Sequence, residues 1–290
     1  MRTEDLLKKV RRLEIKTKGL TKHLFSGEYH SSFKGRGMAF SEVRDYHFGD
    51  DVRNIDWNVT ARFREPYVKV FEEERELTLM LIVDLSGSTD YGTGEQTKRD
   101  LAVELSAVLG FSAEANNDKV GAIFVTDRVE RFIPPMKGRK HLLYLLRELI
   151  EFQPKGSGTN LEEGLRYFRN VVRKRSIAFV ISDFVQQEDS YLEALKISQR
   201  KHDVLAIRLQ DASEKSLPDI GMVEMFNAET GRKTWVNTSS KKLREDFEKR
   251  QRQLEEEMEN RFEKNGIDYA SIETGEDYIP VLMRLFRQRK

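Results

Sequence analysis

The feature that most constrains the fold is an apolar run of seven residues, 77–83, which ends directly at Asp84. A short, nearly continuous apolar run is typical of a buried β-strand. The next residues include Ser86, Gly87 and Ser88, so oxygen side chains begin where the strand ends. In an open α/β sheet, ligands bind outside the carboxyl ends of the strands. The sequence therefore predicts a ligand site directly after this strand.

Strands and helices alternate along most of the remaining chain. Further strands are predicted at 120–125, 177–182, 204–209 and 267–272, and an antiparallel strand at 128–133. Helices are predicted at 98–116, 139–152, 160–173, 191–201, 240–265 and 278–288. This alternation is typical of right-handed βαβ units. We therefore expect an α/β fold with a doubly wound, mainly parallel sheet.

The amino-terminal part of the chain has a different pattern. Residues 3–20 predict a helix, and residues 23–64 are polar, aromatic and interrupted by glycine, which predicts a small β-rich or irregular module. A hairpin is expected from the two short strands 222–226 and 233–236. We therefore divide the chain into an amino-terminal helix and module, 1–75, and an α/β domain, 76–290, with a hairpin insertion near 218–238.

Composition excludes several classes of function. Lysine and arginine number 50 and aspartate and glutamate 49, so no excess charge draws the chain to nucleic acid. The chain has no cysteine, which excludes disulfides, thiolate zinc sites and cysteine nucleophiles. It also lacks an apolar stretch of the roughly 20 residues that span a bilayer. We expect a cytoplasmic protein without a direct membrane span.

Three separate segments are expected to meet at one edge of the sheet. They supply Asp84, Ser86 and Ser88 after the first strand, Thr159 after a glycine-bearing loop, and Asp183 after the strand 177–182. Mg²⁺ favours oxygen ligands of this kind. Capping of helices and turns by the same aspartates and serines is the alternative. Without metal, Asp84 and Asp183 would repel each other, which predicts a raised pKa for one of them.

In this order, the five residues resemble the metal-ion-dependent adhesion site of von Willebrand factor type A domains. The resemblance covers residues 77–209 and, with the last strand and helix, implies a von Willebrand factor type A-like, Rossmann-like sheet. It implies that Asp84, Ser86, Ser88 and Thr159 bind Mg²⁺, or Mn²⁺ or Ca²⁺, and that Asp183 binds directly or through water. In that family a partner often supplies an acidic oxygen to the metal.

A second resemblance lies in the amino-terminal module. Segments 26–31, 34–37, 40–46 and 49–62 resemble the signature of a prokaryotic family of unknown function, whose members are typically encoded beside MoxR-type AAA+ ATPases. Physically, the charged residues of this module predict an ion-pair network, with Trp57 as its apolar anchor. A surface that contacts a partner is the alternative. The network would comprise Arg44, Arg53, Arg62, Asp45, Asp50, Asp51 and Asp56.

No motif in the sequence indicates an enzyme. The loop 156–159 lacks the lysine of a phosphate-binding loop, and residues 85–88 do not match the G-x-S-x-G pattern of a nucleophile elbow. We therefore predict a non-enzymatic, metal-dependent adaptor that binds an acidic side chain of a protein partner. By resemblance, the partner is a MoxR-type AAA+ ATPase, a client protein, or both, in chaperone-like maturation or assembly of complexes. The alternatives are a metal-dependent phosphohydrolase and a scaffold whose metal site is vestigial.

Overall fold

The computed structural model describes residues 38–73, 77–94, 96–156, 158–185, 190–226 and 233–289. Contacts divide the described residues into two compact units that meet in sequence between Leu77 and Thr78. The helix predicted over 3–20 lies outside the described residues, as do the first part of the amino-terminal module and Ser157.

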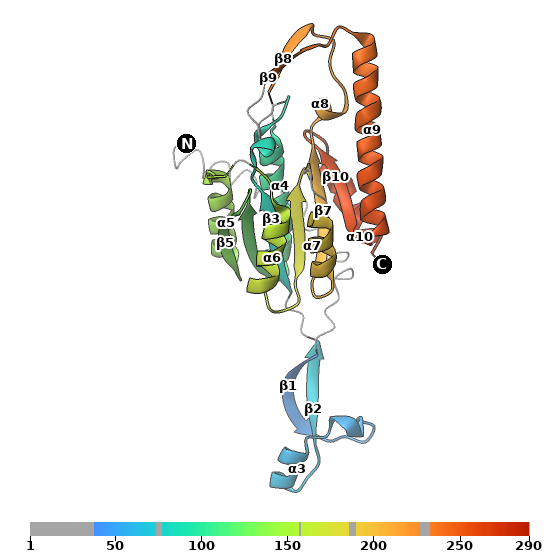
Figure 1. Cartoon of the computed structure of the whole chain (residues 1–290). Helices are drawn as coiled ribbons and strands as arrows, with labels where there is room; N and C mark the ends of the chain where they lie inside the picture. The colour runs from blue at the N-terminus through green and yellow to red at the C-terminus, as the bar shows by residue number, and fades with distance from the viewer. Residues whose placement is uncertain are drawn as a thin grey trace. The chain divides into compact units, whose positions relative to one another are not determined.

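The larger unit contains a six-stranded sheet with the strand order β10-β7-β6-β3-β4-β5 (Figure 1). Its strands are β3 (Thr78–Asp84), β4 (Lys119–Val125), β5 (Val129–Met136), β6 (Ile177–Ser182), β7 (Asp203–Gln210) and β10 (Asp268–Glu273). Neighbouring strands are parallel except for β4 and β5, which pair antiparallel. The predicted α/β fold with a mainly parallel sheet is therefore confirmed.

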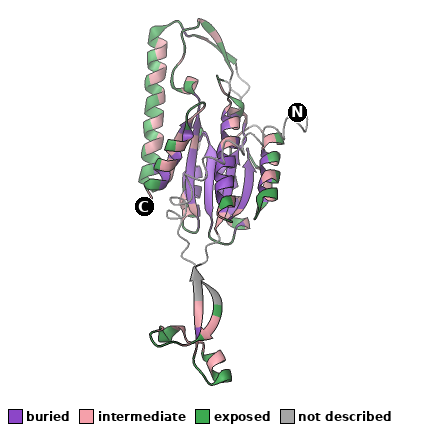
Figure 2. Ribbon diagram, turned by 180° about the vertical axis from the view of Figure 1, so that it is seen from behind, coloured by how far each residue is buried: buried purple, intermediate pink, exposed green. Residues whose placement is uncertain are grey.

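Helices cover both faces of this sheet, so the central strands are buried on both sides (Figure 2). The helices of the larger unit are α4 (Lys98–Ala115), α5 (Arg139–Glu151), α6 (Leu161–Val171), α7 (Ser190–Gln199), α8 (Ala212–Lys215), α9 (Lys241–Lys264) and α10 (Tyr278–Arg287). On one face, α6, α7 and Phe262 at the end of α9 pack on the sheet. On the other face, α10 places Phe286 against Phe179 of β6.

The order of the strands fixes where a ligand can bind. From β3 the chain continues to β4 and β5 on one side, and it then returns to β6 and β7 on the other side of β3. The strand order therefore reverses beside β3, and such a reversal opens a crevice at the carboxyl ends of the strands. Asp84 ends β3 and Asp183 directly follows β6, so both aspartates lie at this crevice.

The predicted hairpin and the long charged helix follow β7 in the chain. Strand β8 (Met222–Phe226) pairs antiparallel with β9 (Lys233–Asn237), and α9 follows (Figure 1). Phe262 is the one fully buried side chain of α9. Most of the helix therefore presents a solvated surface, as its composition predicts.

The smaller unit combines a two-stranded sheet with short helices. Strand β1 (Met38–Asp45) pairs antiparallel with β2 (Tyr67–Glu73), and η1 (Val52–Asn54) and α3 (Trp57–Phe63) lie between them in sequence. The helix α3 was not predicted, although the carboxylate of Asp56 accepts hydrogen bonds from two backbone N–H groups at its start.

The predicted ion-pair network of this module is smaller than expected. Arg44 donates two hydrogen bonds to Asp50, at 2.8 and 2.7 Å, which is a bidentate ion pair. Arg53 and Asp51 form a second, exposed ion pair at 3.5 Å. Asp51 and Asp56 also cap the short helices η1 and α3. The prediction that Trp57 is an apolar anchor is wrong, because Trp57 is 68% exposed.

Candidate metal centre

Asp84 is a fully buried carboxylate at the end of β3. Its Oδ1 accepts a hydrogen bond from the backbone N–H of Ser86 at 2.9 Å, and its Oδ2 accepts one from the Ser182 hydroxyl at 2.6 Å. Both donors are neutral, and within the described residues no basic side chain forms an ion pair with Asp84. A buried charge is ordinarily paired, bound to a metal or neutralised by a proton.

The pKa of Asp84 reflects this environment. Burial and the negative charge of Asp183 raise the pKa of the Asp84 carboxyl to about 7, against the lowering effect of hydrogen bonds from Ser182 and Ser86. The prediction that repulsion raises the pKa of one aspartate is confirmed, although burial is the larger cause. Asp84 is therefore able to exchange a proton for a cation near neutral pH.

The hydroxyls of Ser86 and Ser88 complete the first segment of the site. Ser86 occupies the N-cap position of η2 (Gly87–Asp90), but its side chain makes no capping hydrogen bond. Its Oγ instead forms a hydrogen bond with the Oγ of Ser88, at 3.1 Å. Two adjacent ligands of an octahedral ion with bonds of about 2.1 Å are about 3 Å apart. The spacing therefore fits a magnesium ion, and the capping alternative is wrong for Ser86.

The loop that carries Thr159 is held at the same edge of the sheet. Thr159 directly precedes Asn160, the N-cap residue of α6. The backbone N–H of Asn160 donates to the carbonyl of Thr126 at 2.7 Å, directly after β4. Glu130 of β5 accepts hydrogen bonds from the backbone N–H groups of Lys155 and Gly156, at 3.0 and 2.7 Å. Because β4 neighbours β3, Thr159 lies at the edge that holds Asp84.

Asp183 is buried and already has protein partners. Its Oδ2 accepts a hydrogen bond from the Lys98 ammonium at 2.8 Å, and its Oδ1 accepts one from the backbone N–H of Val185 at 3.2 Å. Lys98 also donates to Glu214 of α8, at 2.7 Å. This arrangement suits contact between Asp183 and a metal through a water molecule better than direct binding.

The residues present fit a hard divalent cation. Within the described part of the chain, no group of three or more acidic, histidine or cysteine side chains could hold a metal ion. The candidate site therefore depends on one carboxylate and several hydroxyls, which suits Mg²⁺ because this ion usually keeps several of its waters. Asp84, Ser86, Ser88 and Thr159 would hold it, with Asp183 nearby. A bound ion would supply a positive charge with coordination positions open to a ligand.

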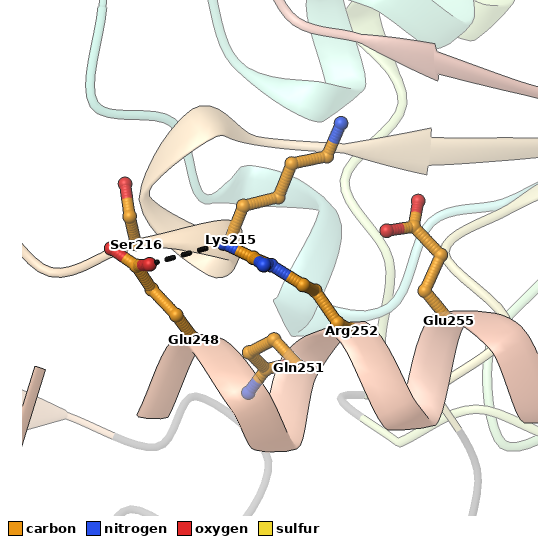
Figure 3. A pocket seen from close by; sticks show the side chains of 6 residues that line it. All are labelled: Lys215, Ser216, Glu248, Gln251, Arg252 and Glu255. Carbon is orange, nitrogen blue, oxygen red and sulfur yellow. Dashed lines mark hydrogen bonds and ion pairs between the residues drawn. The ribbon is translucent and has the colours of Figure 1, made fainter. Parts of the chain in front are cut away.

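A second candidate is a pocket of about 400 Å³ between α8 and α9 (Figure 3). It is lined by Lys215, Ser216, Glu248, Gln251, Arg252 and Glu255. Arg252 and Glu248 of α9 form an ion pair across 3.4 Å in this pocket. Acidic and basic side chains are mixed along its wall, so its charge selects no class of ligand. The five predicted metal ligands are not among its lining residues.

The fold and this site define an α/β protein with a polar ligand site at the carboxyl edge of a mainly parallel sheet. Residues 42–257 match the family described as "Protein of unknown function DUF58", and the chain belongs to this family. The predicted membership of a family of unknown function is thereby confirmed.

A relative from Mycobacterium tuberculosis supports this assignment. The chain is 30% identical to the "Uncharacterized protein Rv1480" of Mycobacterium tuberculosis over 97% of this chain and 89% of that protein. The crystal structure of the conserved hypothetical protein BatB from Bacteroides thetaiotaomicron is similar at a TM-score of 0.48 and 14% identity, over 73% of this chain and 98% of that one. A von Willebrand factor type A protein from Catenulispora acidiphila is similar at a TM-score of 0.36 and 13% identity, over 49% and 34% of the two chains.

Among the helices in the described ranges, none combines the length and the apolar character needed to cross a membrane.

Proposed function

We propose that this protein is a cytoplasmic, non-enzymatic adaptor that binds an acidic side chain of another protein through a divalent cation. Asp84, Ser86, Ser88 and Thr159 bind the cation in this proposal, and Asp183 contacts it through water. The acidic side chain of the partner completes the coordination. A metal with an open position binds a carboxylate only in certain directions and only while the metal is present, so the contact is specific and reversible.

The observation that carries this proposal is the buried Asp84 carboxylate, which has hydrogen-bond donors but no cationic partner among the described residues. A purely structural aspartate at this depth would be expected to pair with a basic side chain, as Asp183 does with Lys98. The 3.1 Å spacing of the two serine hydroxyls supports the same proposal.

We propose a MoxR-type AAA+ ATPase as the partner, because members of the family that the amino-terminal motif resembles are encoded beside such ATPases. The ATPase would supply the energy, and the adaptor would connect it to a client in maturation or assembly of protein complexes. A client protein that offers its own acidic side chain is compatible with the same chemistry.

A metal-dependent phosphohydrolase is the second candidate for this site. It would need a base or nucleophile beside the metal. Asp183 is a further carboxylate whose charge acts on Asp84, but both of its oxygens already accept hydrogen bonds, from Lys98 and from the backbone of Val185. This pairing favours binding over catalysis. Release of phosphate from small substrates by the purified protein, lost in Asp84→Ala, would support the enzyme instead.

Affinity capture from native cell extract tests the adaptor. The full chain serves as bait in Mg²⁺ or in chelator, and wild type is compared with Asp84→Ala. Asp90→Ala is the matched control, because Asp90 lies in the same segment but is exposed and forms an ion pair with Arg99. We expect an AAA+ ATPase to be retained by wild type and Asp90→Ala in Mg²⁺ only. Retention of the ATPase by Asp84→Ala in chelator would support the scaffold with a vestigial metal site.

A further inference from the structure

We infer that Lys98 is the internal counter-cation of this site, and that it limits the affinity for the divalent cation by neutralising Asp183. The inference rests on the proposed metal site and adds a residue that determines the charge of that site. Lys98 contacts Asp183 in place of the metal, so Asp84 remains the one carboxylate that binds the cation directly.

The position of Lys98 is unfavourable for a lysine in two respects. It is the first residue of α4, a helix of 18 residues, where the helix dipole disfavours positive charge. It is also 1% exposed, and burial disfavours a charged ammonium. Strong partners are required to offset both costs. The Asp183 and Glu214 carboxylates are these partners, at 2.8 and 2.7 Å from its Nζ.

The backbone at the start of α4 fixes where this side chain begins. Thr97 caps the helix and forms a reciprocal capping box with Asp100. The backbone N–H of Lys98 donates to the carbonyl of Tyr91, which follows η2. The loop after β3 and the start of α4 are therefore connected at Lys98, and its ammonium reaches the end of β6 and α8. An ammonium held in this way is part of the site rather than a surface charge.

The two aspartates at the site consequently differ in charge compensation. Asp183 has Lys98, whereas Asp84 has two neutral donors. With Lys98 present, a divalent cation gains one uncompensated carboxylate and experiences repulsion from a nearby ammonium. The bound ion would keep a net positive charge, which favours an acidic ligand from the partner. Lys98 would thus weaken metal binding and strengthen the attraction for the acidic partner.

Removing the ammonium should therefore tighten metal binding. Lys98→Met keeps most of the side-chain volume and leaves Asp183 free to attract the cation. We expect Mn²⁺ to bind at least about tenfold more tightly to Lys98→Met than to wild type, since the like charge beside Asp183 is removed. In chelator the variant should melt at a lower temperature than wild type, and Mn²⁺ should raise its melting temperature by more than it raises that of wild type.

Glu214→Gln is the matched control, because it removes the outer partner of Lys98 and leaves the ammonium on Asp183. We expect its Mn²⁺ affinity to stay at or below that of wild type. If Lys98→Met does not fold, the double variant Lys98→Met/Glu214→Gln is used instead. It removes the Lys98 ammonium together with the Glu214 carboxylate that pairs with it, so no unpaired charge is left at Glu214. The double variant should also bind Mn²⁺ about tenfold more tightly than wild type.

Calorimetric titration of the full chain with Mn²⁺ separates the outcomes. Tighter binding by the Lys98 variants, with Glu214→Gln unchanged or weaker, supports the inference. Binding by wild type with equal or weaker binding by the Lys98 variants overturns the role of Lys98 and leaves the metal site intact. No binding by any of the proteins overturns the proposed metal site, and the inference with it.

Discussion

Asp84 and Asp183 are chemically identical side chains at neighbouring strand ends, but their surroundings make them different. Asp183 is next to the Lys98 ammonium, whereas Asp84 is fully buried with two neutral hydrogen-bond donors. A cation that enters the site is therefore attracted chiefly by Asp84. The hydroxyls of Ser86 and Ser88 add neutral ligands without adding charge.

The raised pKa of Asp84, about 7, gives a prediction for pH dependence. The pKa in the folded protein is above the unfolded value of about 3.9, so without metal the folded protein loses stability as pH rises between these values. Mg²⁺ needs the ionised carboxylate and competes with the proton below about pH 7. We expect Mg²⁺ to raise the melting temperature more at pH 8 than at pH 6.

The matched variant is Asp84→Asn, which cannot ionise. Its melting temperature should not respond to Mg²⁺ at either pH. An equal response of wild type at pH 6 and pH 8 would mean that the ion binds elsewhere, and a response of Asp84→Asn would mean the same.

At the scale of elements, the site is assembled from strand ends and the loops that follow them. The position of the loop before α6 depends on a residue that is distant in sequence. Glu130 holds it, because one oxygen of this carboxylate accepts hydrogen bonds from Lys155, Gly156 and the hydroxyl of Thr126. A Cβ at Gly156 would clash with the side chains of Asp127 and Thr126, so a larger residue there would displace them.

Glu130→Ala should loosen the loop that carries Thr159. We expect Mg²⁺ affinity to fall several-fold, and the free energy of unfolding to fall by about 1–2 kcal/mol through the lost hydrogen bonds. Titration calorimetry and denaturant unfolding measure the two quantities. Glu151→Ala, at the exposed end of α5, is the control. If metal affinity is unchanged while stability falls, the loop and Thr159 contribute nothing to metal binding.

Much of the architecture could be predicted from the sequence, because its signals are local. The run before Asp84 is β3, and the periodic segments became α4 to α7 and α9 at nearly the predicted bounds. The short helix α8 was missed, although Asp211 and Glu214 have the spacing of a capping box. The role of Lys98 depends on contacts with residues 85 and 116 positions away, which periodicity cannot reveal. The sequence does contain one local sign of this role, because a lysine at the first position of a helix is unfavourable and indicates acidic partners nearby.

At the scale of the whole molecule, the two units contain different candidate features for binding. The larger unit contains the six-stranded sheet and the candidate metal centre, which lies where the strand order reverses beside β3. The smaller unit carries much of the amino-terminal motif and exposes Phe48, Trp57 and Phe63. The exposure of Trp57 favours the alternative that this module contacts a partner. The proposed adaptor would then combine a metal-dependent contact with a second contact from the smaller unit.

The most direct test of the metal centre is an anomalous difference map from crystals of the full chain grown with Mn²⁺. We predict a peak about 2–2.3 Å from a carboxylate oxygen of Asp84 and from the hydroxyl oxygens of Ser86 and Ser88, with Lys98 still on Asp183. Crystals of Asp84→Asn should lack this peak. A map of wild type without a peak at the end of β3, at saturating Mn²⁺ and about pH 8, would contradict the account.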